Sequence, residues 1–295
     1  MRIVTRPDFD GVVCALLLKD VLGITSPVLW VQPNDMQRGL VTIRKNDIIA
    51  NLPYHENCSL WFDHHYSNRI DNEFEGSFEI APSAAGVVFD YYGHQFSRDF
   101  SSLIRETDKI DSADLTLDEI LHPERYPCIL LSMTVSGHDG TINSYSDRLV
   151  DLLGTSEVDS VLDDHDVRSR CDRVIEENKI YREFLLRYTK QEGQVSITDF
   201  RSLKPAPDGN RFLVYSLLPD TVVNVKIIHD KDDMAIIKVG HSIINRHCHV
   251  NVGKMLSAFE GGGHRGAGAC RFKRDKTDNY LSAILDILQK NDPDE

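Results

Sequence analysis

The chain has 295 residues, 41% of them hydrophobic and 27% charged, which is the composition of an ordered globular protein and not of a disordered one. Its length exceeds what one hydrophobic core normally supports and therefore predicts two domains. The formal net charge of −13 opposes binding to duplex DNA, because non-specific duplex binding depends on many lysine and arginine contacts to phosphates.

The N-terminal half alternates short apolar runs with helical patterns. A strand at 2–5 precedes a turn and a helix from Gly11 to Leu22, which Gly23 ends as a C-cap. The elements predicted next are strands at 28–31, 47–52 and 59–62, helices at 83–92 and 100–106, and partial helix between 120 and 155. Strands that alternate with helices predict a doubly wound α/β sheet with parallel pairing.

The C-terminal half begins with a long helix. Its charged sequence with one apolar side extends from Val167 to Lys190, and Gly193 is expected to end it. The elements predicted after it are a strand at 195–200 that opens a second domain, a β-hairpin of 222–229 and 234–239, a helix at 250–259 capped by Gly261–Gly263, a strand at 270–272 and a helix at 280–288.

No membrane or targeting segment is predicted. The apolar run Val12–Leu18 stops at Lys19, far short of a membrane span, and Asp8 and Asp10 interrupt any signal-peptide core. The six cysteines are scattered without a Cys-x-x-Cys pair, which favours reduced thiols. We therefore expect a cytoplasmic protein that does not contact membranes.

Acidic and histidine side chains follow two of the predicted strands. Asp8 and Asp10 come after the first strand, and the strand at 59–62 runs into Asp63-His64-His65. In an open α/β sheet, ligands bind at the carboxyl ends of the strands. Carboxylate and imidazole donors suit Mn²⁺ or a similar divalent ion, and Asp63 is a candidate to orient a ligand histidine. The alternative for the first pair is a solvated turn with an aspartate cap.

Two further stretches carry candidate functional groups. Asp108 lies near a predicted helix end, where an exposed helix face is the competing interpretation. Gly261-Gly262-Gly263 precedes His264 and Arg265. Successive glycines let backbone N–H groups approach an anion, and the two basic side chains add charge-assisted donors. We expect a phosphate-binding loop there, against the alternative of a flexible loop that caps the preceding helix.

We assign no metal site to three other polar clusters. The run Asp163-Asp164-His165-Asp166 precedes the long helix, where acidic residues favour the positive end of the helix dipole. His247-Cys248-His249 lacks the second ligand pair of a zinc finger. His138-Asp139-Gly140 is predicted to form a turn.

The Asp-x-Asp pair, Asp63-His64-His65, Asp108 and the Gly-Gly-Gly-His segment together resemble the DHH phosphoesterase family, in the same order along nearly the whole chain. The resemblance implies a Rossmann-like, parallel-sheet catalytic domain at 1–190, which includes the long linker helix. It also implies a smaller mixed-sheet α/β domain at 194–290 that closes over the crevice. Members include nanoRNases, pAp phosphatases, cyclic-dinucleotide phosphodiesterases, RecJ-like exonucleases and exopolyphosphatases.

The resemblance also implies roles for individual residues. The expected metal ligands are Asp8, Asp10, His64 and Asp108, for one or two ions of Mn²⁺ or Mg²⁺; the expected catalytic residues are His65 and Asp63; and the expected substrate-binding residues are Gly262, Gly263, His264 and Arg265.

Two positions depart from the family pattern. Many members have a histidine four residues before the first aspartate of the Asp-x-Asp pair, where this chain has Val4. Members also bridge two metals with an aspartate at the end of the strand before Asp-His-His. Asp47 and Asn51 are the candidates for that position, and the sequence leaves the choice open. If Asn51 holds it, the bridging anion is absent and one metal site is weakened.

The function that follows is metal-assisted hydrolysis at phosphorus. The substrate is a small nucleotide, a short oligonucleotide or polyphosphate, and the bond is a phosphodiester, phosphomonoester or phosphoanhydride. The two departures motivate an alternative, a nucleotide- or phosphate-binding sensor with a degenerate metal centre and little turnover. The substrate and the oligomeric state, including a homodimer, are left open.

Overall fold

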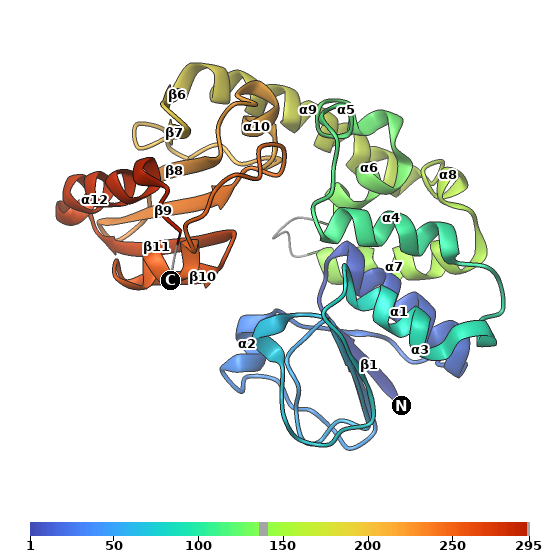
Figure 1. Ribbon diagram of the computed structural model, residues 1–295. Coiled ribbons are helices and arrows are strands. Elements are labelled where there is room, and N and C mark those ends of the chain that lie inside the picture. Colours follow the sequence, from blue (N-terminus) through green and yellow to red (C-terminus); the bar gives the residue numbers. More distant parts are fainter. Residues whose placement is uncertain (136–140, 294–295) are drawn as a thin grey trace. The chain divides into compact units, whose positions relative to one another are not determined.

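The computed structural model describes residues 1–135 and 141–293, so the predicted turn His138-Asp139-Gly140 lies outside the described residues. The chain divides into two compact units. Unit 1 consists of Met1–Asp114 and Pro123–Val174, and unit 2 of Leu115–His122 and the chain from Ile175 onward. Helix α9 (His165–Tyr188) passes from one unit into the other (Figure 1). Within the described ranges, no helix has the length and apolar character needed to cross a membrane.

Unit 1 is built on a five-stranded sheet in which every paired strand is parallel, in the order β2-β1-β3-β4-β5. The strands are β1 (Arg2–Thr5), β2 (Leu29–Trp30), β3 (Asp47–Ala50), β4 (Leu60–Asp63) and β5 (Gly76–Phe78). Strand β3 is buried along its whole length, as a parallel strand covered on both faces requires. The predicted α/β class with a parallel sheet is confirmed.

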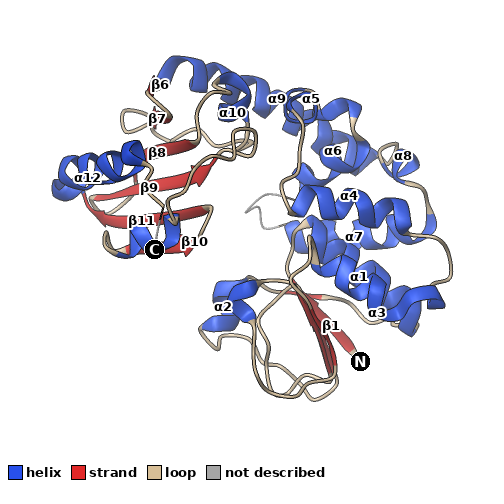
Figure 2. Cartoon of the chain, in the orientation of Figure 1, coloured by secondary structure: helices blue, strands red, loops and turns tan. Residues whose placement is uncertain are grey.

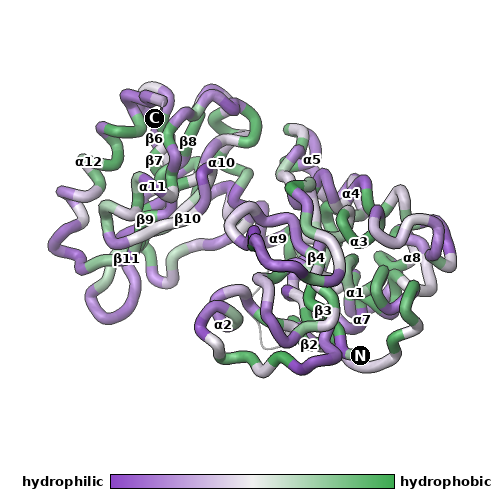
Figure 3. Tube along the Cα trace, turned by 60° about the horizontal axis from the view of Figure 1, so that its bottom comes forward, coloured by the Kyte–Doolittle hydropathy of each residue, from purple (hydrophilic) through white to green (hydrophobic). Residues whose placement is uncertain are grey.

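Apolar layers cover the sheet of unit 1. The helices of this unit are α1 (Phe9–Leu22), α2 (Pro33–Gln37), α3 (Ala84–Tyr92), α4 (Ser101–Asp111), α6 (Pro127–Thr134), α7 (Ile142–Thr155) and α8 (Val158–Val161). Helix α1 packs against α3, α4 and α7, and both α1 and β3 are hydrophobic in Figure 3. Gly23 ends α1 with a left-handed φ of 62°, as predicted. A second apolar cluster surrounds Trp61 and includes Val4.

Helix α9 begins at His165, before the predicted Val167, and ends at Tyr188, before the predicted Lys190. Asp164 Oδ1 accepts hydrogen bonds from the backbone N–H groups of Asp166 and Val167, at 3.0 and 3.2 Å, which confirms the capping role of the acidic run. The helix stops at Tyr188, because the next residues form β6 (Thr189–Glu192), which pairs with β7 (Val195–Asp199). The expected end at Gly193 is therefore wrong. Pairing of β6 with the next strand, in a hairpin that turns at Gly193, overrides the helical pattern there.

Unit 2 contains a mixed six-stranded sheet in the order β10-β11-β9-β8-β7-β6 (Figure 2). Its further elements are α5 (Leu117–Leu121), α10 (Leu213–Leu217), β8 (Val223–His229), β9 (Met234–His241), α11 (Val252–Ser257), β10 (Gly261–His264), β11 (Ala267–Lys273) and α12 (Thr277–Lys290). The predicted hairpin is β8 and β9, which pair antiparallel. The predicted smaller α/β domain with a mixed sheet is confirmed.

The glycine-rich segment is a strand, which corrects the prediction of a loop and a helix cap. Strand β10 pairs antiparallel with β11, with Gly263 opposite Gly268. A Cβ atom on Gly263 would lie 2.4 Å from the carbonyl oxygen of Ala267, and its φ is +151°. A Cβ atom on Gly253 of α11 would lie 2.2 Å from the Gly263 carbonyl oxygen. These glycines allow close backbone packing of β10 between β11 and α11.

Alanine at Gly263 is therefore expected to destabilise unit 2 by about 1–3 kcal/mol, because the side chain would clash with backbone atoms in a strained conformation. Alanine at Gly262 is the matched control, because nothing lies within 4 Å of its Cβ position. Denaturant unfolding of the two variants checks this expectation. Equal stability of the two would show that the tight packing of β10 does not need a glycine.

Candidate functional site

The candidate site lies at the carboxyl ends of three neighbouring strands. The order of the sheet puts β1 between β2 and β3, so the chain changes direction between β1 and β3, which is where ligands bind in such sheets. Asp8 and Asp10 follow β1, Asn51 follows β3, and Asp63 is the last residue of β4. His64 comes next. The structure thus gathers the residues that the sequence places after these strands.

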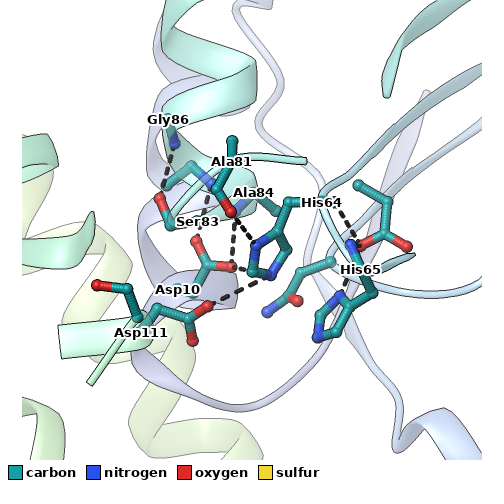
Figure 4. A network of polar contacts seen from close by, with 12 residues as sticks. Asp10, His64, His65, Ala81, Ser83, Ala84, Gly86 and Asp111 are labelled. Carbon is teal, nitrogen blue, oxygen red and sulfur yellow. Dashed lines mark hydrogen bonds and ion pairs between the residues drawn. The ribbon is translucent and has the colours of Figure 1, made fainter. Parts of the chain in front are cut away.

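Asp10 is anchored in the protein interior. Its side chain lies in the first turn of α1 and is 2% exposed. The carboxylate accepts hydrogen bonds from the N–H groups of Ala84 and Ala85, at 3.0 and 2.8 Å, which begin helix α3 (Figure 4). Burial, with the nearby charge of Asp8, raises the pKa of Asp10 to about 7. A cation beside this carboxylate would restore its charge at neutral pH.

His64 directs one ring nitrogen at two carboxylates. Its Nδ1 lies 2.9 Å from the carbonyl oxygen of Ala81 and donates its proton to that oxygen, so Nε2 is the ring nitrogen that can bind an ion. Nε2 lies 3.3 Å from Asp111 Oδ2 and 3.9 Å from Asp10 Oδ2. This buried nitrogen has no hydrogen-bond partner among the described residues. Two carboxylates and an imidazole nitrogen therefore meet at one point, which fits a divalent ion.

Asp111 is the ligand candidate that the sequence analysis missed. It ends helix α4, and burial, with the charges of Asp10 and Asp8, raises its pKa to about 7. Asp108, the residue predicted instead, belongs to no group of potential ligands found among the described residues. Its Oδ1 accepts a 2.6 Å hydrogen bond from Ser83 Oγ. Asp108 and Asp111 are three residues apart and share a helix face. Which of the two carboxylates reaches His64 therefore depends on how far α4 extends along its axis toward the strand ends.

Asp108 acts through the start of α3. Ser83 Oγ accepts a hydrogen bond from the N–H of Gly86 at 2.9 Å and so caps that helix, while the same hydroxyl donates to Asp108. A Cβ atom on Gly86 would lie 2.9 Å from Asp108 Oδ1, which explains the glycine at this position. Asp108 thus positions the helix whose N–H groups hold Asp10.

Asp8 lies beside this group, with both carboxylate oxygens engaged by neighbours. As N-cap of α1, Oδ1 accepts from the N–H of Gly11 at 2.9 Å and from Asn51 Nδ2 at 3.0 Å. Oδ2 lies 3.0 Å from Arg6 Nε. Burial raises the pKa of Asp8, although the Arg6 charge opposes the rise. The capping alternative is realised here, and Asp8 is not in the ligand group of Asp10, His64 and Asp111.

The structure decides between Asp47 and Asn51. Asp47 begins β3, where it forms a 2.6 Å ion pair with Arg2. It therefore lies at the amino end of the parallel strands, opposite the candidate site. Asn51 follows the end of β3 and contacts Asp8. Its φ of 55° is one that asparagine tolerates better than most residues. An amide, not a carboxylate, therefore occupies the strand end next to the candidate metal ligands.

Asp63 and His65 form a hydrogen-bonded pair. The Asp63 side chain is fully buried, and its Oδ1 accepts from His65 Nδ1 at 2.8 Å. Asn68 Nδ2 donates to Oδ2 at 2.6 Å. Burial lowers the pKa of His65, but the hydrogen bond to Asp63 and its charge outweigh this and raise the pKa overall. Although Asp63, His64 and His65 also bring ligand atoms together, these hydrogen bonds assign Asp63 to orienting His65.

Divalent-metal binding should depend steeply on pH. In the metal-free protein Asp10 and Asp111 have pKa values of about 7, so an ion must displace their protons below that pH. Mn²⁺ affinity is expected to rise from pH 5 to 8, by up to about tenfold per pH unit for each displaced proton. Calorimetry in buffers of different ionisation enthalpy measures the released protons. Affinity that is constant over this range would contradict the expectation.

The same linkage predicts the stability of the metal-free protein. Because the folded-state pKa values of these two carboxyls exceed the ordinary value of 3.8, the folded state binds more protons than the unfolded state between those limits. Their contribution to stability is therefore lost as the pH rises from about 4 to 7.

Comparison with known proteins gives one close and several distant structural matches. No protein-family model matches the chain, and no curated protein sequence does. The pGpG-specific phosphodiesterase PggH from Vibrio cholerae is 30% identical, with a TM-score of 0.85 over 99% of both chains. An exopolyphosphatase-related protein from Bacteroides fragilis is 12% identical, with a TM-score of 0.55 over 98% of this chain and 92% of that one.

RecJ from Thermus thermophilus, crystallised with Mn²⁺, shares the fold. It is 13% identical, with a TM-score of 0.57, and the match covers 99% of this chain and 52% of RecJ. The match to PggH is close enough in identity and coverage to establish the family. Together with the order of the motifs and the cluster of acidic and histidine ligands, it confirms the resemblance: this chain is a member of the DHH family of metal-dependent phosphoesterases.

Proposed function

We propose that this protein hydrolyses a phosphodiester bond in a small nucleotide, such as a linear dinucleotide, with Mn²⁺ or Mg²⁺ held by Asp10, His64 and Asp111. This proposal depends mainly on His64 Nε2, which has no hydrogen-bond partner among the described residues and faces the buried carboxylate of Asp10 and the partly exposed carboxylate of Asp111. Similarity to a pGpG-specific phosphodiesterase over the full length supports the substrate class, and RecJ crystallised with Mn²⁺ supports the metal.

The residues of the chain prepare the metal ligands. When bound, the ion lowers the pKa of a water molecule and neutralises charge on the phosphoryl oxygens. The N–H groups of Ala84 and Ala85 fix Asp10, and the Ala81 carbonyl fixes the ring of His64. Side chains held in this way need no rearrangement when the substrate arrives, which is the condition for efficient electrostatic stabilisation.

His65 supplies a cationic donor. Asp63 accepts the hydrogen bond from Nδ1 and raises the pKa of the ring, which favours the protonated form that can also donate from Nε2. Toward a phosphodiester, this donor would stabilise a phosphoryl oxygen or protonate the leaving oxygen. We assign His65 as a catalytic residue and Asp63 as the residue that keeps it protonated and oriented.

We further propose that unit 1 is the catalytic part and that unit 2 binds the substrate through Gly262, Gly263, His264 and Arg265. Strand β10 is an edge strand, which leaves a row of its backbone groups without a strand partner. His264 and Arg265 are exposed, and Arg265 Nη2 donates to the His249 carbonyl oxygen at 3.1 Å. An edge strand with two basic side chains suits a phosphate group.

Replacing both His264 and Arg265 with alanine should weaken binding of a nucleotide ligand and leave metal content intact. Each lost charge-assisted hydrogen bond is expected to cost about 1.5–3 kcal/mol. Calorimetry with a non-hydrolysable dinucleotide measures the loss. Arg271→Ala is the control, because Arg271 lies on β11 and pairs with Asp230. Loss of metal together with ligand affinity would assign this edge a structural role instead.

The decisive test of the function is hydrolysis by the purified protein. Incubation with Mn²⁺ and pGpG should yield mononucleotides by chromatography, faster than inorganic phosphate is released from polyphosphate. Addition of one water molecule per phosphodiester accounts for the products. The Asp111→Asn variant should be inactive. Dinucleotide binding without turnover in the metal-loaded protein would overturn this function and establish the sensor alternative.

A further inference from the structure

A guanidinium and an amide hold Asp8, an acidic residue beside the ligand group that is not part of it. Arg6 Nε lies 3.0 Å from Asp8 Oδ2, and Asn51 Nδ2 donates to Asp8 Oδ1 at 3.0 Å. The Gly11 N–H donates to the same Oδ1. Each carboxylate oxygen thus already faces a positively polarised group.

These contacts oppose a second metal ion at Asp8. Two ions in one centre lie roughly 3.5–4 Å apart, and an anionic bridge is needed to offset their repulsion. At the corresponding strand end this chain has the neutral Asn51, which turns its N–H₂ group, and not its oxygen, toward Asp8. Asp47 cannot replace the bridge, because it is paired with Arg2 at the amino end of the strands.

Arg6 supplies one positive charge at the place where a divalent ion would bring two. Its guanidinium is charged at every physiological pH. The turn that carries Arg6 is tightly closed, since a Cβ atom on Gly11 would lie 2.0 Å from the Arg6 carbonyl oxygen. The Arg6 side chain is 40% exposed, so its outer nitrogens can also meet an oxygen of a phosphate group.

We propose that this centre holds a single divalent ion, at Asp10, His64 and Asp111, and that Arg6 replaces a second ion beside Asp8. The inference rests on the proposed function for the identity of the first ligand group, but it concerns the number of ions. Ion counting needs no turnover, so failure of this inference and failure of the proposed hydrolysis can be told apart.

The test begins with the wild-type protein. After loading with Mn²⁺ and removal of excess metal, elemental analysis should find one Mn²⁺ per chain. Electron paramagnetic resonance should show the hyperfine pattern of an isolated ion. Two ions per chain, or the broadened spectrum of an exchange-coupled pair, would overturn the inference. Hydrolysis with one ion supports both proposals, and retention of no ion overturns both.

A double variant tests the two residues directly. Arg6→Gln with Asn51→Asp removes the guanidinium and supplies the missing anion, and should raise the content to two Mn²⁺ per chain with a coupled spectrum. Aspartate tolerates the backbone conformation of Asn51 nearly as well as asparagine does. Arg148→Gln, which breaks a guanidinium–carboxylate pair with Asp164 elsewhere in unit 1, should leave the content at one. A folded double variant with one ion would show that Arg6 and Asn51 do not set the count.

Discussion

Replacing Asp10 with asparagine is expected to abolish tight Mn²⁺ binding and to lower kcat/KM by about a thousandfold or more. The variant loses the anionic ligand at the centre of the group, and metal stabilisation of a phosphoryl transition state amounts to several kcal/mol, with about 1.4 kcal/mol for each tenfold in rate. Calorimetry and a metal-dependent phosphodiester assay measure the two losses. Asp20→Asn is the control, because Asp20 lies on the same helix but contacts Ser97. Unchanged Mn²⁺ affinity would remove Asp10 from the ligands.

The same substitution should also lower stability. An aspartate exposed in a crevice could be replaced without loss of stability. Asp10 differs, because it is buried and accepts two backbone hydrogen bonds. Asparagine retains only one acceptor oxygen, and the expected loss is about 1–3 kcal/mol. Asp111→Asn separates the two effects, since the Asp111 side chain is 29% exposed and ends its helix. This variant should lose the metal with little change in the unfolding transition.

Replacing His65 with glutamine should lower kcat by about 10²–10⁴, the range that general acid–base catalysis contributes, without changing metal content. His65 is outside the group formed by Asp10, His64 and Asp111. The raised pKa of His65 means that the wild-type rate should fall only as the pH rises above that pKa and the ring loses its proton. This alkaline limb should disappear in the variant.

A pH–rate profile with saturating Mn²⁺ measures both effects. His94→Gln serves as the control, because His94 is exposed at the end of α3. If the variant lost Mn²⁺ in parallel with rate, His65 would be a ligand and not an acid.

The site could be predicted from sequence to the extent that it depends on strand ends. Residues that follow β1 and β4 must lie at the carboxyl ends of the parallel strands. The apolar runs that precede Asp10 and His64 therefore suffice to predict that both belong to the site. The choice between Asp108 and Asp111 depends on how deeply α4 is inserted, and no local pattern encodes that depth. The choice between Asp47 and Asn51 depended on where a short strand begins, which is the least reliable part of a prediction from sequence.

The role of the glycines in β10 could not be predicted from the sequence for a different reason. Consecutive glycines can approach an anion or another backbone equally well, because both require only the absence of Cβ. The backbones are those of α11 and β11, which come directly before and after β10 in the chain, so their close approach depends on how tightly the chain turns back on each side of β10.

The two amide groups that hold Asp10 also extend the metal centre into helix α3. A bound ion would share one carboxylate with the N–H groups of Ala84 and Ala85, so the backbone amide resonances of these residues report metal occupancy without any added label. A change at Ser83 or Gly86 that frays the start of α3 should weaken ion binding, because it frees Asp10 from the two N–H groups that orient it.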